Sequence, residues 1–372
     1  MSGGLRRVFA RHFDAYCRDH RLDAQRLRVA EHIRCCRTPA LGGQRLRCER
    51  CGAEPVRYHS CRDRHCPRCQ GRARRQWAER ERRNGLAVTY YHLVFTLPSP
   101  LNPWAELHPE VLYRLLFQSA WAVLAAFGQD PRRLGGQLGM TAVLHTWGQN
   151  LSRHLHLHCL IPGGAWTPEG HWRAAKGYYL FPVRALARKF RGRMLSELRA
   201  ARADGELAQI SRAGEFARVL DELAQIDWVV YAKPCLGYRE QVLEYLARYS
   251  HRIALSDSRL VEAEDGSVGL HYKDYADHGR KKLLWLAPEE LIRRFLLHIL
   301  PKGFMRIRHY GFLANCCRQK RLAAIRQDLQ TPPQPEPTAD GAVQDFQYPC
   351  PKCHTGRLRV IEEIPPQRFE GG

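Results

Sequence analysis

The order of hydrophobic and polar residues divides the chain into short β-like stretches and longer stretches with helical spacing. Residues 88–97 (V-T-Y-Y-H-L-V-F-T-L) are rich in β-branched and aromatic side chains and stop before Pro98, which predicts a strand. Further strands are predicted at 138–147, 154–161, 228–232, 252–256, 259–264, 267–273 and 282–286. Apolar residues at helical spacing predict helices at 5–34, 72–83, 107–128, 183–200, 212–225, 239–250 and 288–299.

Strands and helices mix without the regular strand–helix repeat of a doubly wound sheet. We therefore expect an α+β fold with a central antiparallel sheet flanked by helices. A glycine-, cysteine- and arginine-rich stretch at 42–70 and a proline-rich stretch at 330–345 interrupt the pattern. These changes predict an N-terminal domain (1–87), a central domain (88–315), a basic segment with a linker (316–345) and a small cysteine-containing tail (346–372).

The run His154-Leu155-His156-Leu157-His158 lies in one of the predicted strands. Successive strand side chains point to opposite faces, so three imidazoles share one face and two leucines share the other. Imidazoles gathered on a buried strand need hydrogen-bond partners or a charge, and metal binding meets that need. The alternative is a polar face whose histidines are merely hydrated. The pattern favours a metal site on this strand.

Two cysteine pairs in the glycine- and arginine-rich stretch have the spacing of a zinc site. Cys48-x2-Cys51 and Cys66-x2-Cys69 stand 14 residues apart, which predicts one structural zinc ion with four thiolate ligands. The ion replaces a core that this stretch lacks. Other nearby candidates are left open as ligands of a second site or as spare residues: Cys35, Cys36, His59, Cys61 and His65.

A third cysteine pair, Cys350 and Cys353, lies in the tail and forms only half of a zinc ribbon. Cys316 and Cys317 are candidates for the other half, although adjacent cysteines are awkward tetrahedral ligands. The ligands of this pair stay unassigned.

Tyr245 and Tyr249 are one helical turn apart in Y-L-A-R-Y, so both phenols can address one point. Packing at the edge of a core is the alternative, because Val242 and Leu246 complete an apolar stripe with them. A divalent cation on a histidine strand and a nearby phenol are together the parts needed for covalent cleavage of a phosphodiester. The combination favours two nucleophilic tyrosines.

The charge of the chain points to a polyanionic partner. It has 59 lysines and arginines against 37 acidic residues, a net charge of +22. Such an excess, dominated by arginine, is typical of nucleic-acid binding. No apolar run is expected to span a membrane and no signal peptide is evident. The 14 cysteines should be reduced, which favours a cytoplasmic or nucleoid-associated protein.

At these residues the chain resembles the rolling-circle transposases of the insertion sequence 91 family, which are two-tyrosine endonucleases with a histidine-hydrophobic-histidine (HUH) motif. The matching stretches are C-R-T-P-A-L-G-G (36–43), S-C-R-D-R-H-C-P-R-C-Q (60–70), H-T-W-G-Q-N-L (145–151), H-L-H-L-H-C-L-I-P-G-G (154–164), W-V-V-Y-A-K-P (228–234), Y-L-A-R-Y-S-H-R-I-A-L-S (245–256) and R-I-R-H-Y-G-F-L-A-N (306–315). The chain departs slightly at Cys235 and Leu236, and its tail matches only weakly.

The resemblance implies that His156 and His158 bind the catalytic Mg²⁺ or Mn²⁺ and that Tyr245 and Tyr249 are the nucleophiles. It also implies a zinc-binding N-terminal domain with Cys48, Cys51, Cys66 and Cys69 as ligands. Three ligands on one strand converge poorly, since alternate residues lie about 6.6–7 Å apart. The third ligand is therefore expected to be Gln149 rather than His154, with His145 behind Gln149 as a further candidate.

The implied function is transposition by cleavage and rejoining of single-stranded or hairpin DNA at the ends of a mobile element and of target DNA. Basic residues predicted to contact this DNA are Arg62, Arg64, Arg248, Arg252, Lys281, Lys282, Arg306 and Arg308. A plasmid or phage replication initiator or relaxase would use the same catalytic residues. A zinc-dependent DNA-binding regulator without catalysis would need neither tyrosine.

Overall fold

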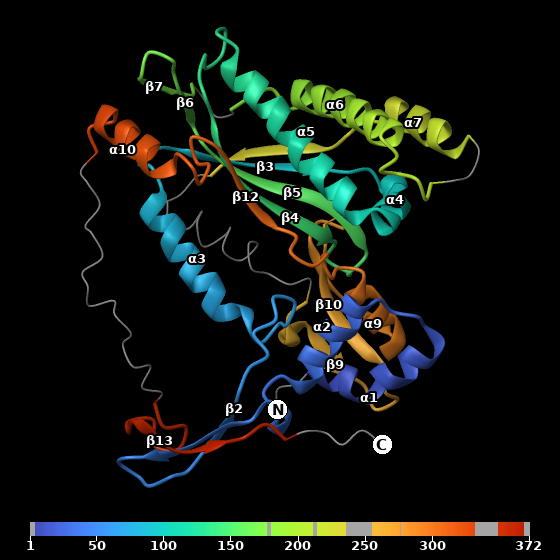
Figure 1. Ribbon diagram of the computed structural model, residues 1–372, viewed down its shortest axis with the longest axis vertical. Coiled ribbons are helices and arrows are strands. Elements are labelled where there is room, and N and C mark those ends of the chain that lie inside the picture. The colour runs from blue at the N-terminus through green and yellow to red at the C-terminus, as the bar shows by residue number, and fades with distance from the viewer. Residues whose placement is uncertain are drawn as a thin grey trace.

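The computed structural model describes residues 4–176, 180–210, 214–235, 255–275, 277–331 and 349–367. Its centre is a five-stranded antiparallel sheet in the order β12-β4-β5-β3-β8 (Figure 1). The strands are β3 (Tyr90–Thr96), β4 (Gly139–Trp147), β5 (Arg153–Pro162), β8 (Val230–Pro234) and β12 (Ile307–Gly311). The histidine strand, β5, is therefore the central strand, as an α+β fold around an antiparallel sheet predicts.

One face of this sheet is covered by helices and forms the main hydrophobic core. Leu155 and Leu157 of β5 are fully buried there, as the alternation of the strand predicts. Figure 1 shows α5, α6 and α7 together on this side. The helices of this layer are α4 (Asn102–Leu107), α5 (Pro109–Gln129), α6 (Val183–Ala203) and α7 (Glu215–Gln225).

Helix α5 bears on the expectation that no apolar run spans a membrane. It is long and apolar enough, by length and composition, to cross a membrane. Its buried residues, such as Leu116, Phe117 and Leu124, pack into the main core, and α5 lies against α6. The apolar character of α5 is thus accounted for by its place between the sheet and a second helix.

The opposite face of the sheet carries the histidines. At one end it is covered by α3 (Gln70–Asn84), whose Trp77 and Ala78 pack against Leu160 of β5. Helix α10 (Arg318–Asp328) packs beside it through Leu322 and Ile325. A two-stranded ribbon, β6 (Gly164–Trp166) with β7 (Trp172–Ala174), follows β5 directly.

A second hydrophobic core joins the start of the chain to residues 255–299. Helices α1 (Gly4–Asp19) and α2 (Ala24–Cys35) pack with α9 (Pro288–Leu296) and with a sheet in the order β11-β10-β9. The strands are β9 (Leu260–Glu262), β10 (Val268–Asp274) and β11 (Arg280–Leu286). The predicted helix 5–34 is two helices, because the Asp23 side chain accepts a hydrogen bond from Arg26 N and caps the start of α2.

A third unit combines the two ends of the described chain. Its sheet has the order β13-β1-β2, formed by β1 (Gly43–Cys48), β2 (Val56–Tyr58) and β13 (Leu358–Ile364) (Figure 1). The tail therefore adds a strand to the N-terminal region rather than standing apart. Single 3₁₀ turns occur at Pro39–Leu41, Ser99–Leu101 and Asp257–Arg259. The predicted helix 239–250 lies outside the described residues, as does most of the predicted strand 252–256.

Candidate active site and zinc centres

The pairing of β4 with β5 brings three imidazoles together on the face of the sheet away from the main core. His145 lies directly opposite His156, and Val143 lies opposite His158. One ring nitrogen from each of His145, His156 and His158 lies within 4.8 Å of the others. His145 and His158 are buried and His156 is half-buried. The cluster is thus built from two adjacent central strands, whose backbone positions are fixed by the sheet.

Hydrogen bonds orient two of these rings. His156 Nδ1 lies 2.9 Å from the carbonyl oxygen of His154, to which Nδ1–H donates. His158 Nδ1 lies 2.8 Å from Nε2 of His92, which stands on the neighbouring strand β3. With a proton on Nδ1, each ring keeps its Nε2 lone pair for a metal, the arrangement that ligating histidines usually have. His92, which the sequence suggested as a structural residue or a phosphate contact, is therefore placed to position the His158 ring.

Burial keeps these imidazoles neutral. It lowers the pKa of His156 and of His92 to about 4, and it lowers the pKa of His158 well below its usual value. The neighbouring histidines add to the effect at His158, because positive charges on adjacent rings repel. Neutral imidazole is the form that binds a metal, so the site is ready for a cation at neutral pH.

The third member of the cluster is His145, which the sequence analysis offered as a further candidate behind Gln149 and His154. Gln149 lies in the turn between β4 and β5, where its carbonyl oxygen accepts a hydrogen bond from Arg259. His154 is exposed; its carbonyl oxygen accepts the hydrogen bond from His156 Nδ1, and its ring lies 4.9 Å from the His156 ring between centroids. The strand register places His145 opposite His156 instead, one strand away, so the three rings converge without bending β5.

The donor set bears on which metal fits. Three neutral imidazoles suit a transition metal, whereas Mg²⁺ prefers oxygen ligands. Among the two cations predicted, the residues present fit Mn²⁺ better than Mg²⁺. The predicted nucleophiles, Tyr245 and Tyr249, lie outside the described residues, as do the basic residues Arg248 and Arg252.

Four cysteines form the first thiolate cluster: Cys36, Cys61, Cys66 and Cys69. Cys36 caps the end of α2 and Cys69 caps the start of α3. Sulfur–sulfur distances are 3.5 Å for Cys36–Cys69 and Cys61–Cys69. Four sulfurs bound tetrahedrally to zinc at about 2.3 Å lie about 3.8 Å apart, so the cluster has the right size for the ion.

The first cluster lies in a loop that docks on the sheet that carries the histidines. Asp63 accepts hydrogen bonds from His65 and His32; although burial raises its pKa, these bonds hold that pKa below its usual value. Nε2 of His65 accepts from Leu300 N at 3.1 Å, and Arg64 donates to the carbonyl oxygens of Pro301 and Phe304. These residues immediately precede β12, so the zinc loop is tied to an edge strand of the histidine sheet.

The predicted grouping of Cys48, Cys51, Cys66 and Cys69 around one ion is corrected by the structure. Cys66 and Cys69 belong to the first cluster, whereas Cys48 and Cys51 meet Cys350 and Cys353 in a second one. Cys36 stands at the end of α2, whereas Cys48 is the last residue of β1. Among the residues described, the two clusters share no thiolate. The alternatives Cys36 and Cys61 are ligands of the first cluster, while Cys316 and Cys317 join neither.

The basic residues predicted to contact DNA separate into two groups. Four are occupied within the protein: Arg64 as described, Lys282 with Asp274 and Asp277, Arg306 by burial, and Arg308 against the rings of Phe117 and Phe304. Arg62 and Lys281 are exposed. DNA contact by Arg64, Lys282, Arg306 and Arg308 would therefore have to be made alongside these intramolecular contacts.

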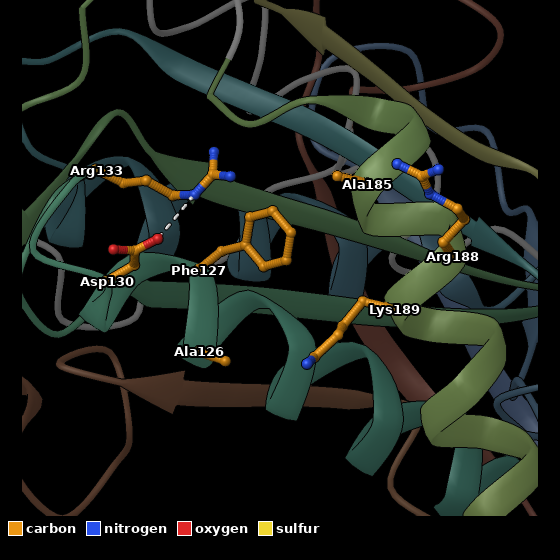
Figure 2. Close-up of a pocket in the computed structure, with 7 residues that line it drawn as sticks. All are labelled: Ala126, Phe127, Asp130, Arg133, Ala185, Arg188 and Lys189. Carbon is orange, nitrogen blue, oxygen red and sulfur yellow. Dashed lines mark ion pairs between the residues drawn. The ribbon is translucent and has the colours of Figure 1, made fainter.

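A pocket of about 510 Å³ opens between α5 and α6 (Figure 2). Figure 2 shows Ala126 and Phe127 of α5 on one side of the pocket and Arg188 and Lys189 of α6 on the other, with Arg133 paired to Asp130 at 3.3 Å. The Arg133 guanidinium lies 4.6 Å from the centre of the Phe127 ring. This pocket belongs to the helical layer, on the other side of the sheet from the histidines, and contributes nothing to the cluster.

Comparisons with known proteins agree with this geometry. Residues 139–320 match a family model described as "Putative transposase", and residues 8–97 match one described as "Transposase zinc-binding domain". The chain is 43% identical to putative transposase y4qJ of Sinorhizobium fredii over 95% of this chain and 94% of that protein. The chain belongs to the insertion sequence 91 family of transposases. No solved structure matches it.

A more distant relative of the transposase extends the comparison. The transposase for insertion sequence element IS801 of Pseudomonas savastanoi pv. phaseolicola is 27% identical over 79% of this chain and 72% of that protein.

The zinc-binding match contains all four cysteines of the first cluster. It contains only Cys48 and Cys51 of the second, and the match to the transposase model ends at residue 320, before the tail.

Proposed function

We propose that this transposase cleaves and rejoins single-stranded DNA at the ends of a mobile element, through a 5′-phosphotyrosine intermediate, in rolling-circle transposition. The observation that carries the proposal is the cluster of His145, His156 and His158 on the central strands of a family transposase. In the proposed division of the chain, residues 1–87 bind zinc and residues 88–315 carry the nuclease. The protein would act in the bacterial cytoplasm, on nucleoid DNA.

In the proposed reaction, the phenol oxygen of Tyr245 or Tyr249 attacks the scissile phosphorus. The new bond joins phosphorus to the tyrosine oxygen, and the bond from phosphorus to the 3′ oxygen breaks. The phenol proton is lost and the 3′ oxygen leaves as a hydroxyl after gaining a proton. A free 3′ hydroxyl attacking the phosphotyrosine reverses these changes and joins strands. Two tyrosines allow a second strand to be cut while the first covalent end is kept.

The histidines would hold the divalent cation, which when bound polarises the phosphate and stabilises its developing charge. His92 and the His154 carbonyl would keep the ligand rings turned toward it. Manganese is the cation we expect to support cleavage at the lowest concentration, because three imidazoles favour it over magnesium.

A surface suited to unpaired bases supports single-stranded rather than duplex substrate. On β10 and β11, His271, Lys273, Lys281, Leu283 and Trp285 are all exposed. Their register places Lys273 opposite Lys281 and His271 opposite Leu283 on one face of the sheet. Cations on the same sheet face as an exposed indole match a DNA strand, whose phosphates need positive charge and whose bases stack on aromatic rings. We propose that Lys281 and Arg62 contact the strand.

Two other functions predict different behaviour. A replication initiator or relaxase would form the same adduct, so it differs in its DNA: the transposase should act on the terminal sequences of the element that encodes it. A zinc-dependent DNA-binding regulator would form no adduct and would be indifferent to both tyrosines.

The test is adduct formation on denaturing gels. Protein with Mn²⁺ and labelled single-stranded element ends should give a covalent protein–DNA species. Tyrosine-to-phenylalanine changes keep the rings and delete only the hydroxyls, so Y245F and Y249F singly should each lose transposition, while at least one of them should still nick single-stranded DNA. The double variant should form no adduct.

Melting temperatures that match the parent protein are the control for folding in all three variants. A full yield of adduct from the double variant would remove tyrosine chemistry at these positions from the proposal.

A further inference from the structure

The second thiolate cluster brings together two cysteine pairs that lie far apart in the sequence. Cys48 and Cys51 come from the end of β1 and the turn after it, and Cys350 and Cys353 come from the tail. Sulfur–sulfur distances are 3.8 Å for Cys48–Cys353 and 3.6 Å for Cys51–Cys350. These distances match four thiolates around zinc and are far too long for disulfides, whose bonds are about 2.05 Å.

The backbone around the tail pair is arranged for thiolate ligands. Lys352 N donates to Cys350 Sγ at 3.4 Å, and Gly356 N donates to Cys353 Sγ at 3.3 Å. Such N–H···S bonds favour the charged form of the sulfur that a metal requires. A side chain at position 356 would collide with Cys48 Sγ, so the glycine there allows the two cysteine pairs to approach.

The strands beside the cluster bring little apolar surface of their own. The small core here consists of Leu46, Cys48, Cys350 and Leu358, so half of its members are cysteines. Along β13 only Leu358 is buried, and Val360 and Ile361 are about half exposed. A three-stranded sheet with such a small core is marginal in water unless something else holds it. The ion pair between Arg45 and Glu362 is largely exposed and contributes little.

We propose that Cys48, Cys51, Cys350 and Cys353 bind a second zinc ion, and that this ion clamps the C-terminal tail to the N-terminal sheet. The ion occupies its own site, since the first cluster has its own four cysteines. The clamp pairs β13 with β1 from Gly43 opposite Ile364 to Cys48 opposite Leu358. This inference does not rest on the proposed reaction, and its tests require no DNA.

Zinc content of the full-length purified protein is the first test. Elemental analysis by mass spectrometry should find two zinc ions per chain. The double variant Cys350→Ser/Cys353→Ser should retain one, and so should Cys61→Ser/Cys69→Ser. The matched control is Cys316→Ser/Cys317→Ser, which removes two cysteines outside both clusters and should retain two. An equal zinc content in the parent protein and in Cys350→Ser/Cys353→Ser would overturn the proposal.

A second test distinguishes a clamp from a tail that is attached by other contacts. A protease recognition sequence is inserted between Thr338 and Ala339, and the protein is cut after purification in zinc. On size exclusion the tail fragment should stay with the body in the parent and in Cys316→Ser/Cys317→Ser. It should separate in Cys350→Ser/Cys353→Ser, which still holds zinc at the first cluster. Coelution of the fragment in that variant would overturn the clamp.

Discussion

At the level of single residues, the register of β4 against β5 decides which imidazoles meet. His145 and His156 are paired across the two strands, and His158, two residues after His156, lies on the same face of the sheet. The three rings therefore come together from two strands with their backbone positions already fixed. A site that is preformed in this way loses little entropy when a cation binds.

We expect His145→Ala, His156→Ala and His158→Ala each to lower DNA nicking by on the order of 100-fold or more, because each removes a metal ligand. Binding of the DNA strand should change little. His154→Ala and Gln149→Ala should nick within about threefold of the parent, since the proposed ligands are the three clustered histidines His145, His156 and His158. Nicking rates measured across a Mn²⁺ titration check this ranking, and equal losses at His145 and Gln149 would contradict it.

His92→Ala should behave differently from the ligand variants. It removes the partner of His158 Nδ1 without removing a ligand. The apparent affinity for Mn²⁺ should fall by about 10–100-fold, while excess Mn²⁺ restores the nicking rate. A loss that no concentration of Mn²⁺ rescues would show that His92 does more than position the ligand.

At the level of elements, the turn between β4 and β5 is held by the segment that follows α9. His298 lies 3.2 Å from the Thr146 hydroxyl through Nδ1, and its Nε2 lies 3.1 Å from the carbonyl oxygen of Leu151. Arg294 of α9 donates to the carbonyl oxygen of Asn150. The second hydrophobic core thus supports the hairpin that aligns the histidine strands.

The buried His298 should make folding stability sensitive to acid. Burial lowers its pKa to about 3, against about 6.5 in the unfolded chain, so unfolding takes up a proton below that value. Its contribution is complete above pH 6.5 and is lost progressively as the pH falls toward 3. Between about pH 7 and pH 5 the loss from this residue should be about 2 kcal/mol.

Urea unfolding of the parent and of His298→Gln at both pH values checks this. The variant should be less stable at neutral pH but should lose about 2 kcal/mol less than the parent on acidification. The other buried histidines are the same in both proteins, so their contribution to the pH dependence of the unfolding free energy cancels in the comparison. Identical pH dependence in the two proteins would rule out His298 as a source of the acid sensitivity.

The elements also show what the sequence could and could not predict. Alternation along His154–His158 predicted the buried face of Leu155 and Leu157 correctly, because the period of a strand depends on local geometry alone. The position of the third imidazole depended on the register between two strands. The partners of Cys48 and Cys51 came from the far tail, where Cys350 follows Cys51 by 299 residues. Spacing along the chain carries no information on such distant partners, so nearby cysteines were grouped together.

At the level of the whole molecule, the 59 lysines and arginines exceed the 37 acidic residues, and the net charge of +22 remains after every acidic residue, including those in ion pairs, has been counted. Binding of single-stranded DNA should therefore be strongly salt-dependent. With about six phosphate contacts, affinity should fall on the order of 10³-fold between about 50 and 200 mM salt. Fluorescence anisotropy with a labelled single strand and a blunt duplex checks this. Equal affinity for both at every salt concentration would contradict the proposed substrate.

The cluster of Cys48, Cys51, Cys350 and Cys353 also sets an order of events during synthesis. The first two ligands leave the ribosome long before the last two are translated, because Cys350 follows Cys51 by 299 residues. Until then, a zinc ion on the nascent chain has only half of its protein ligands and remains open to exchange. The small sheet around it is thus completed last, although it contains some of the first residues made. A polypeptide interrupted before Cys350 would carry an unfinished N-terminal sheet, so the fold itself distinguishes such fragments from chains that reach the tail.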